Sequence, residues 1–164
     1  MLLRSLHLIT SRNMSCVTRF KPFSSSFIFR QLFDPKSSTY TYLLGDADSA
    51  ECILIDPVVD HAKRDFQLTK DLNLRLLYAV NTHMHADHIT GTGHLKQLSG
   101  CKSVISRKSG AQADVLIDEN DFITFGNQQL KVLSTPGHTN GCCSFYSAEQ
   151  VVLASECPSE LVKS

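Results

Sequence analysis

The sequence is 164 residues long, 42% hydrophobic and 20% charged, values that are ordinary for a globular domain with its own core. The formal net charge of zero conceals an asymmetry, because residues 1–33 contain five basic and no acidic residues, whereas residues 34–164 contain 11 basic and 16 acidic residues. The body of the chain is therefore mildly acidic and lacks a basic stripe, which excludes nucleic acid as an expected partner.

The first 26 residues have the composition of a mitochondrial transit peptide. They are rich in arginine and serine and free of acidic residues, and their leucines and isoleucine can line one side of a helix. The apolar run is too short and too interrupted to span a membrane, and the continuous apolar centre of a secretory signal is missing. We expect residues 1–26 to direct the protein to the mitochondrial matrix, with the plastid as the alternative destination.

The six cysteines show no CxxC pairing, and Cys16 lies in the expected leader. Adjacent Cys142 and Cys143 do not suggest a disulfide framework, so free thiols in a reducing compartment are the simpler interpretation. We expect Cys142 and Cys143 to be small strand residues.

The rest of the chain is predicted to form strands and two helices. In chain order, strands are expected at 40–44 and 52–56, a helix at 60–73, a buried strand at 74–80, a short helix at 88–98 and a strand at 103–106. Two hairpins are expected to follow, at 121–125 with 130–134 and at 142–146 with 151–154. This pattern predicts an α/β (or α+β) layered domain over residues 27–154, with a mixed sheet packed by helices.

The stretch NTHMHADHITGTG places His83, His85, Asp87 and His88 directly after the predicted buried strand. Imidazole and carboxylate groups are the usual protein ligands of zinc and iron, and loops at the carboxyl ends of strands are where α/β sheets bind their ligands. Glycines 91 and 93 are expected to let the backbone pass close to a neighbouring segment. The stretch therefore predicts a metal site.

A second fragment, TPGHTNGCC, contains His138 on a sharp loop after another predicted strand. His138 is expected to supply a ligand to the same site from its far side. His7, His61 and His94 are isolated, and we expect no role in the site for them.

The stretch THMHADH resembles the H-x-H-x-D-H signature of the metallo-β-lactamase superfamily, whose fold is an αβ/βα sandwich. The flanks RQLFDPKSSTYTYLLGD, LIDPV, LRLLYAVNTHMHADHITGTG, SVISRKSGAQAD and STPGHTNGC, within about residues 30–146, resemble the persulfide dioxygenase (ethylmalonic encephalopathy protein) branch. The leader agrees with the mitochondrial location of that family.

The resemblance implies a function and a set of site residues. Members of the branch oxidise glutathione persulfide with O₂ to sulfite and glutathione at a single non-haem Fe(II), so one Fe(II) is expected per chain. His83 and His138 match two iron ligands, whereas His85, Asp87 and His88 match groups that surround the ligands. Asp56, at the end of its strand, is a further candidate for such support or an ordinary turn residue.

The resemblance ends at VVLASECPSELVKS, where the family has an apolar strand followed by Thr-Gly-Asp. The ligand Asp would align with Cys157, and the neighbouring Glu156 would replace it only if the loop shifted by one residue. We therefore expect residues 155–164 to be a divergent tail on a truncated chain, with the second half of the fold incomplete. A site with two ligands should bind Fe(II) weakly and show little dioxygenase activity.

Two alternatives remain open at this point. In a hydroxyacylglutathione (thioester) hydrolase of the glyoxalase II kind, His83, His85 and His138 would bind one zinc ion, Asp87 and His88 would help to bind a second, and a bridging hydroxide would attack the thioester. The chain could also be a non-catalytic fragment. The sequence leaves the oligomeric state open, homo-oligomers included.

Overall fold

The computed structural model describes residues 26–85, 89–147 and 151–153. Within these residues, the first sheet has the strands β1 (Phe27–Asp34), β2 (Thr39–Asp46), β3 (Glu51–Ile55), β4 (Arg75–Val80), β5 (Lys102–Ser106) and β6 (Val115–Ile117). The second sheet, over the same residues, has the strands β7 (Phe122–Phe125), β8 (Gln128–Ser134), β9 (Cys143–Ser147) and β10 (Val151–Leu153). The helices are α1 (Ala62–Asp71) and α2 (Thr92–Ser99), with short 3₁₀ turns η1 (Val59–His61) and η2 (Arg107–Ser109).

The first sheet follows the order of the chain, β1-β2-β3-β4-β5-β6. Its first three strands are antiparallel, and β3 to β6 run parallel to one another. Parallel neighbours need a crossover connection, and α1 and α2 supply it between β3 and β4 and between β4 and β5. The second sheet is an antiparallel meander in the order β10-β9-β8-β7.

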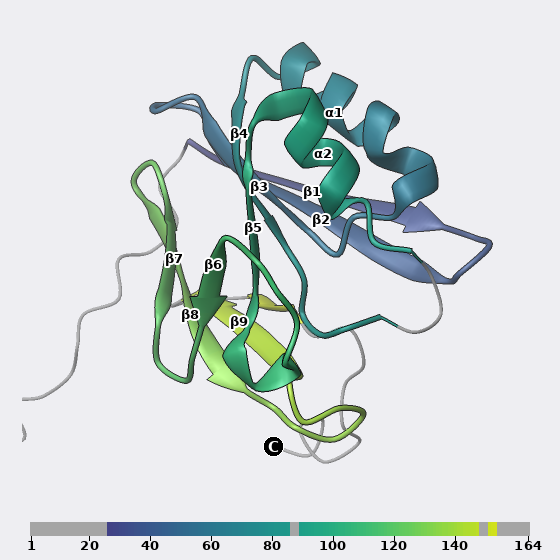
Figure 1. Ribbon diagram of the computed structural model, residues 1–164. Helices are drawn as coiled ribbons and strands as arrows, with labels where there is room; N and C mark the ends of the chain where they lie inside the picture. Colours follow the sequence, from purple (N-terminus) through teal and green to yellow (C-terminus); the bar gives the residue numbers. More distant parts are fainter. Residues whose placement is uncertain (1–25, 86–88, 148–150, 154–164) are drawn as a thin grey trace, which may run out of the picture.

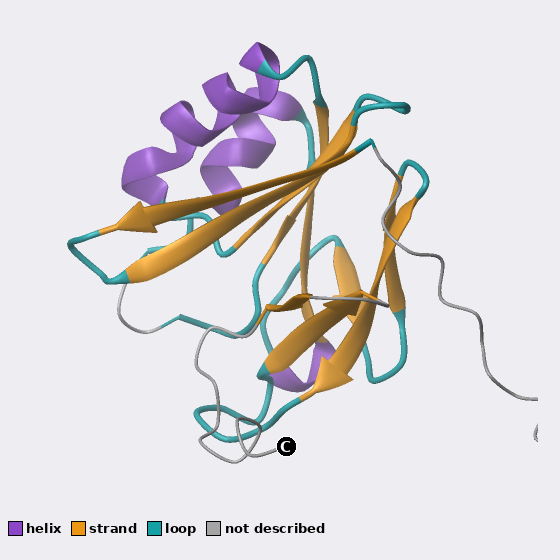
Figure 2. Cartoon of the chain, turned by 180° about the vertical axis from the view of Figure 1, so that it is seen from behind, coloured by secondary structure: helices purple, strands orange, loops and turns teal. Residues whose placement is uncertain are grey.

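The described elements form three layers, with helices on one face of the first sheet and the second sheet on the other (Figures 1 and 2). Alternate residues of the central strands serve the two faces. Leu43, Leu54 and Ala79 pack against α1 and α2, whereas Leu44 and Ile55 pack against the second sheet. Burial on both faces explains why these strands read as continuous apolar runs.

The predicted layered α/β architecture is confirmed. Most strands and both helices lie where the sequence predicted them, within a few residues at each end. The prediction did not give β1 and β6 as separate strands. In the described part of the chain, no helix covers the outer face of the second sheet, so the layers seen are helix, sheet and sheet.

The turn between β7 and β8 ties the two sheets together. Asp46, at the end of β2, accepts hydrogen bonds from Asn127 N (2.9 Å) and Asn127 Nδ2 (3.1 Å). Gly126 N donates to Glu51 Oε2 (2.8 Å), and Gly126 has φ of +58°. The predicted Gly126-Asn127 turn is therefore also a docking contact between sheets.

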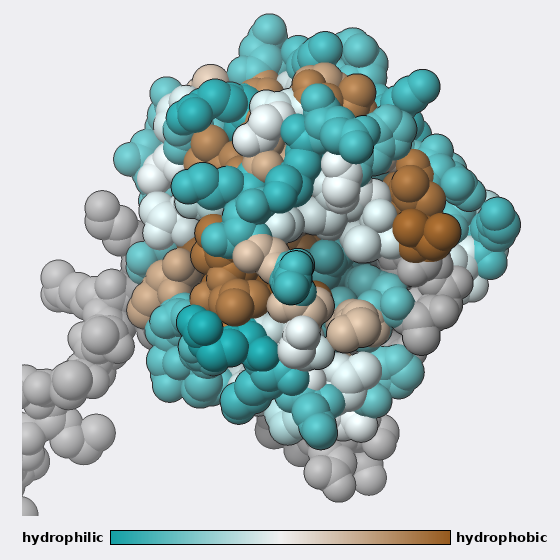
Figure 3. Space-filling view, in the orientation of Figure 1, coloured by the Kyte–Doolittle hydropathy of each residue, from teal (hydrophilic) through white to brown (hydrophobic). Residues whose placement is uncertain are grey.

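The surface seen in Figure 3 is largely hydrophilic, with hydrophobic side chains gathered in separate patches. The exposed large hydrophobic residues include Phe29, Phe33 and Tyr40 of the β1–β2 hairpin. They also include Met84 and Ile89 of the connection between β4 and α2, residues 81–91, which is called the histidine loop below. None of the helices in the described segments has the length and apolar character needed to cross a membrane.

Candidate metal centre

The histidine loop begins at the carboxyl end of β4, in the middle of the first sheet. Ala79 and Val80 are fully buried there, and Asn81 N extends the strand pairing through a hydrogen bond to Val104 O (2.9 Å). His83 is only 4% exposed. The buried strand thus places the first histidine at the carboxyl end of the parallel strands, where open α/β sheets commonly bind ligands.

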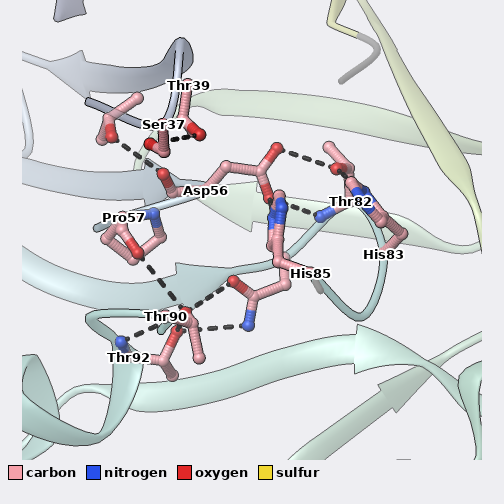
Figure 4. A network of polar contacts seen from close by, with 11 residues as sticks. Ser37, Thr39, Asp56, Pro57, Thr82, His83, His85, Thr90 and Thr92 are labelled. Carbon is pink, nitrogen blue, oxygen red and sulfur yellow. Dashed lines mark hydrogen bonds and ion pairs between the residues drawn. The ribbon is translucent and has the colours of Figure 1, made fainter. Parts of the chain in front are cut away.

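Asp56 organises the start of this loop from the end of β3. Its carboxylate accepts hydrogen bonds from Thr82 N (2.8 Å) and Thr82 Oγ1 (2.8 Å), and its Oδ1 lies 2.9 Å from His85 Nε2 (Figure 4). Thr82 Oγ1 is also 3.0 Å from His83 Nδ1. Asp56 is 2% exposed and has φ of +50°, an uncommon conformation for a residue with a side chain. The Asp56 side chain therefore contacts the loop residues on which the metal prediction depends.

The far end of the loop is attached to the residues that follow Asp56. Val59 N donates to Ile89 O (3.0 Å), and Gly91 N donates to Pro57 O (2.6 Å). A Cβ on Gly91 would lie 2.9 Å from Val58 O, so the close approach expected of this glycine is present. Gly93 does not share that role, because nothing lies within 4 Å of a Cβ built there.

His138 joins the site from the loop between β8 and β9. Cys143 N donates to Thr82 O (2.9 Å), which holds the start of β9 against the histidine loop. The ring centroids of His83 and His138 are 5.2 Å apart and their planes are nearly perpendicular, while those of His83 and His85 are 4.1 Å apart. His138 is exposed, whereas the His85 side chain is 4% exposed. The two distant loops therefore meet, as the sequence predicted.

A thiol holds the loop that contains His138. Cys142 Sγ accepts a hydrogen bond from Thr139 N (3.2 Å) and contacts Thr139 Oγ1 (3.1 Å). Gly141 packs tightly under the loop, since a Cβ there would lie 2.6 Å from Ser109 Cα. Cys142 is thus more than the small strand residue expected from the sequence, because it orders the segment that follows His138.

The other thiols of the described chain are buried and unpaired by disulfides, in agreement with the predicted free cysteines. Burial raises the pKa of Cys52 to about 12, and it also raises the pKa of Cys101 and of Cys143. Thiols with raised pKa values in apolar surroundings are poor nucleophiles. These three residues therefore serve packing.

Some of the predicted site residues lie in the described part of the chain and others do not. Asp87, His88 and Glu156 lie outside the described residues. Among those described, no three or more His, Cys, Asp or Glu side chains are arranged as a complete metal site. The donor set nevertheless fits part of one, because the rings of His83 and His138 lie close together, edge to face, and the buried Asp56 carboxylate is hydrogen-bonded to the residue before His83. His61 belongs elsewhere, with Nε2 3.0 Å from Asp34 Oδ1.

A cavity of about 340 Å³ opens beside the histidines. Its lining includes His83, Met84 and His85 on one side, and Thr92 and Lys96 of α2 on another. Lys96 Nζ is paired with Asp114 Oδ2 at 2.6 Å. The lining is apolar for the most part, so the cavity suits a small molecule with an apolar portion next to the imidazoles.

Residues 34–155 match the family model of the Metallo-beta-lactamase superfamily. The chain belongs to this superfamily. Of the superfamily signature the structure describes His83 and His85, which lie in the segment that Asp56 contacts at the end of β4. The predicted resemblance to the persulfide dioxygenase branch is also confirmed by the relatives described next.

The mitochondrial persulfide dioxygenase ETHE1 of Mus musculus is 61% identical over 124 residues, which are 75% of this chain and 49% of that protein. A crystal structure of ETHE1 from Myxococcus xanthus is 42% identical, with a TM-score of 0.71 over 73% of this chain and 53% of that one. A hydroxyacylglutathione hydrolase of Pelagibacter ubique is 36% identical over 68% of this chain and 48% of that protein. The chain thus spans about half the length of the curated relatives it matches.

Proposed function

We propose that the protein to which this chain belongs is a persulfide dioxygenase, which oxidises glutathione persulfide with O₂ to sulfite and glutathione. The observation that supports this most is the 61% identity to a persulfide dioxygenase over 124 residues, which are 75% of this chain. In the reaction the sulfur–sulfur bond breaks and glutathione leaves as the thiol. Four electrons pass from the terminal sulfur to O₂, and water supplies the third oxygen of sulfite.

The proposed ligands are His83, which follows β4 of the first sheet, and His138, which lies in the β8–β9 loop of the second sheet; together they would hold one Fe(II). When bound, Fe(II) would supply the electron transfer that overcomes the spin barrier between O₂ and the persulfide. A third ligand is to be sought among the residues not described, with Glu156 as the candidate in this chain. His85, Asp87 and His88 are proposed to surround the ligands, and the cavity beside His85 would receive substrate atoms and exclude water.

We also propose limits for the domains of the chain and a location for the protein in the cell. Residues 1–26 would form a mitochondrial transit peptide, residues 27–154 the metallo-β-lactamase-like domain and residues 155–164 a divergent tail. The mouse relative is named as mitochondrial, which supports a mitochondrial destination for this protein. Glutathione persulfide and O₂ are the proposed small-molecule partners.

Oxygen consumption separates this function from its alternative. The whole protein proposed above is purified, reconstituted anaerobically with Fe(II) and given glutathione persulfide, and O₂ uptake and sulfite are followed together. The 164-residue chain by itself is expected to show little activity. We expect equal amounts of O₂ consumed and sulfite formed, with both reduced at least about 100-fold in His83→Ala and His138→Ala, because each change removes a proposed ligand. His94→Ala is the matched control, since His94 lies on α2 outside the proposed ligand set.

The opposite result would favour hydrolysis. A protein that retains two zinc ions, cleaves a glutathione thioester and consumes no O₂ would be a hydrolase, as the similarity to a hydroxyacylglutathione hydrolase allows. Failure of both reactions, together with the absence of a cooperative thermal transition, would support a non-catalytic fragment.

A further inference from the structure

Three buried residues form a continuous chain of hydrogen bonds at the start of the histidine loop. Asp56 Oδ2 and Thr82 Oγ1 are 2.8 Å apart, and Thr82 Oγ1 and His83 Nδ1 are 3.0 Å apart (Figure 4). Asp56 is 2%, Thr82 1% and His83 4% exposed. Water scarcely reaches these groups, so the donors and acceptors at these two contacts decide where the hydrogens between them lie.

The position of each hydrogen can be assigned in turn. A carboxylate only accepts hydrogen bonds, so the single hydroxyl proton of Thr82 must point at Asp56 Oδ2. Thr82 Oγ1 then offers only a lone pair to the neighbouring ring. A hydrogen bond at 3.0 Å between Thr82 Oγ1 and His83 Nδ1 therefore requires the proton on Nδ1.

We propose that Thr82 is a positioning residue. Its hydroxyl donates to the Asp56 carboxylate and accepts from His83 Nδ1, and this fixes the neutral His83 ring as the Nδ1–H tautomer. In that tautomer Nε2 carries the lone pair that a metal ion requires. This inference rests on the proposed function only in taking His83 as a metal ligand.

The same carboxylate has the opposite effect on His85. Asp56 Oδ1 lies 2.9 Å from His85 Nε2, so the neutral His85 ring carries its proton on Nε2 and its lone pair on Nδ1. A direct contact and a contact relayed through one hydroxyl thus produce different tautomers in two histidines only two positions apart. Thr82 is the residue that makes the difference.

The relay matters because the neutral histidine side chain, left to itself, favours the proton on Nε2. Without the Thr82 hydroxyl, the nitrogen that should bind the ion would carry a proton for most of the time. Loss of a partner that orients a metal-binding histidine typically costs about 10- to 100-fold in metal affinity. We expect a loss of this size when the relay is removed.

Nitrogen-15 NMR of the metal-free 164-residue chain tests the assignment directly. Spectra are recorded in alkaline buffer, where imidazoles are neutral, and His83→Gln identifies the His83 signals by their disappearance. We expect a protonated Nδ1 and an unprotonated Nε2 in the wild type and in Thr82→Ser, which retains the hydroxyl. In Thr82→Val, which keeps the shape without the hydroxyl, we expect the Nε2–H form to predominate.

Asp56→Asn tests whether the Asp56 carboxylate sets the direction of these two hydrogen bonds. The amide oxygen can still accept from Thr82 N, which leaves the amide NH₂ to donate to Thr82 Oγ1. The Thr82 hydroxyl must then donate to His83 Nδ1, and the ring changes to the Nε2–H tautomer. An Asp-to-Asn change beside a catalytic histidine is known to select the wrong tautomer in this way.

Titration with Co(II), followed by its visible absorption, supplies the second readout. We expect Co(II) affinity close to that of the wild type in Thr82→Ser, and about 10- to 100-fold weaker in Thr82→Val and Asp56→Asn. A wild-type His83 protonated on Nε2, or a Thr82→Val chain with unchanged tautomer and unchanged Co(II) affinity, would overturn the proposal. Failure of O₂ uptake alone would contradict the proposed dioxygenase and leave these two readouts as they are.

Discussion

Asp56 combines a left-handed backbone conformation with a buried carboxylate that serves several donors. Its φ of +50° turns the chain sharply after β3, and its side chain then lies against Thr82 and His85 of the neighbouring strand end. Asp and Asn tolerate this region of φ better than most residues with a side chain. An unusual backbone conformation at a site of concentrated hydrogen bonding is typical of functional positions.

Gly91, at the end of the histidine loop, and Gly93, in the first turn of α2, give a matched pair of substitutions. In Gly91→Ala the new Cβ would press on Val58 O and Val58 C, at 2.9 and 3.0 Å, and neither backbone atom can move aside easily. We expect a loss of about 1–3 kcal/mol in the free energy of unfolding, measured by urea denaturation. Gly93→Ala meets open space inside α2 and should instead gain about 0.5–1 kcal/mol. Equal effects at the two positions would contradict this prediction.

Part of the candidate site could be predicted from residue types and spacing alone. His83, His85 and His138 are recognisable because imidazoles so placed suggest a metal, and the structure brings their rings together. The contribution of Thr82 could not be predicted in this way. A threonine before a histidine is unremarkable in sequence, and its role depends on a carboxylate that lies 26 positions away along the chain.

At the scale of elements, the β7–β8 turn fastens the second sheet to the first. A Cβ on Gly126 would meet Ser49 Oγ and Asp46 Oδ2 and lie 2.8 Å from Ser49 Cβ. The turn backbone also donates to Asp46 and Glu51. A hairpin that the sequence predicts as a local turn thus has a second function in the packing of sheets.

Gly126→Ala is expected to weaken this contact by two separate effects. The first is the cost of a positive φ, which Gly100→Ala isolates because Gly100 has φ of +74° and open space around its Cβ position. We expect about 1 kcal/mol from that effect. The second is the clash with Ser49 and Asp46, which should lower the free energy of unfolding of Gly126→Ala by about a further 1–3 kcal/mol. Thermal and urea unfolding of both variants would check the difference.

Some elements could be predicted from their pattern and others could not. The strands β3 and β4 are apolar runs with clear ends, and the turn at Gly126-Asn127 is a strong local signal. The strand β1 contains Arg30 and Gln31 and lies at the sheet edge, where pairing with β2 rather than its own composition determines its conformation. The three-residue strand β6 is too short for any periodicity.

At the scale of the whole molecule, several carboxylates are more acidic in the fold than in the unfolded chain. Hydrogen bonds from Ser37 hold the pKa of Asp34 well below its usual range, and Lys96 with Ser103 does the same for Asp114. Burial alone would raise the pKa of Asp46, but hydrogen bonds from Ser26 and Asn127 lower it well below its usual range. Asp46 and Asp114 connect segments distant in sequence, whereas Asp34 holds a local turn and also contacts His61. The ionised forms of all three therefore favour the folded state.

The stability of the chain should therefore fall in acid. Because the pKa values of these three groups are lower in the folded state, the unfolded chain binds protons first as the pH falls. Their contribution is complete above about pH 5 and declines below about pH 4, near the unfolded Asp pKa of about 3.9. Melting temperatures between pH 2.5 and 7 would show this decline, and Asp46→Asn should make it shallower. A melting temperature constant across that range would contradict the prediction.

His83 follows a strand of one sheet, and His138 lies between two strands of the other. A cation bound by both rings would link the two sheets, because both ligands are in place only while the sheets stay packed together. Metal binding and packing of the two sheets would then be thermodynamically linked, so a bound metal ion would also raise the stability of the fold.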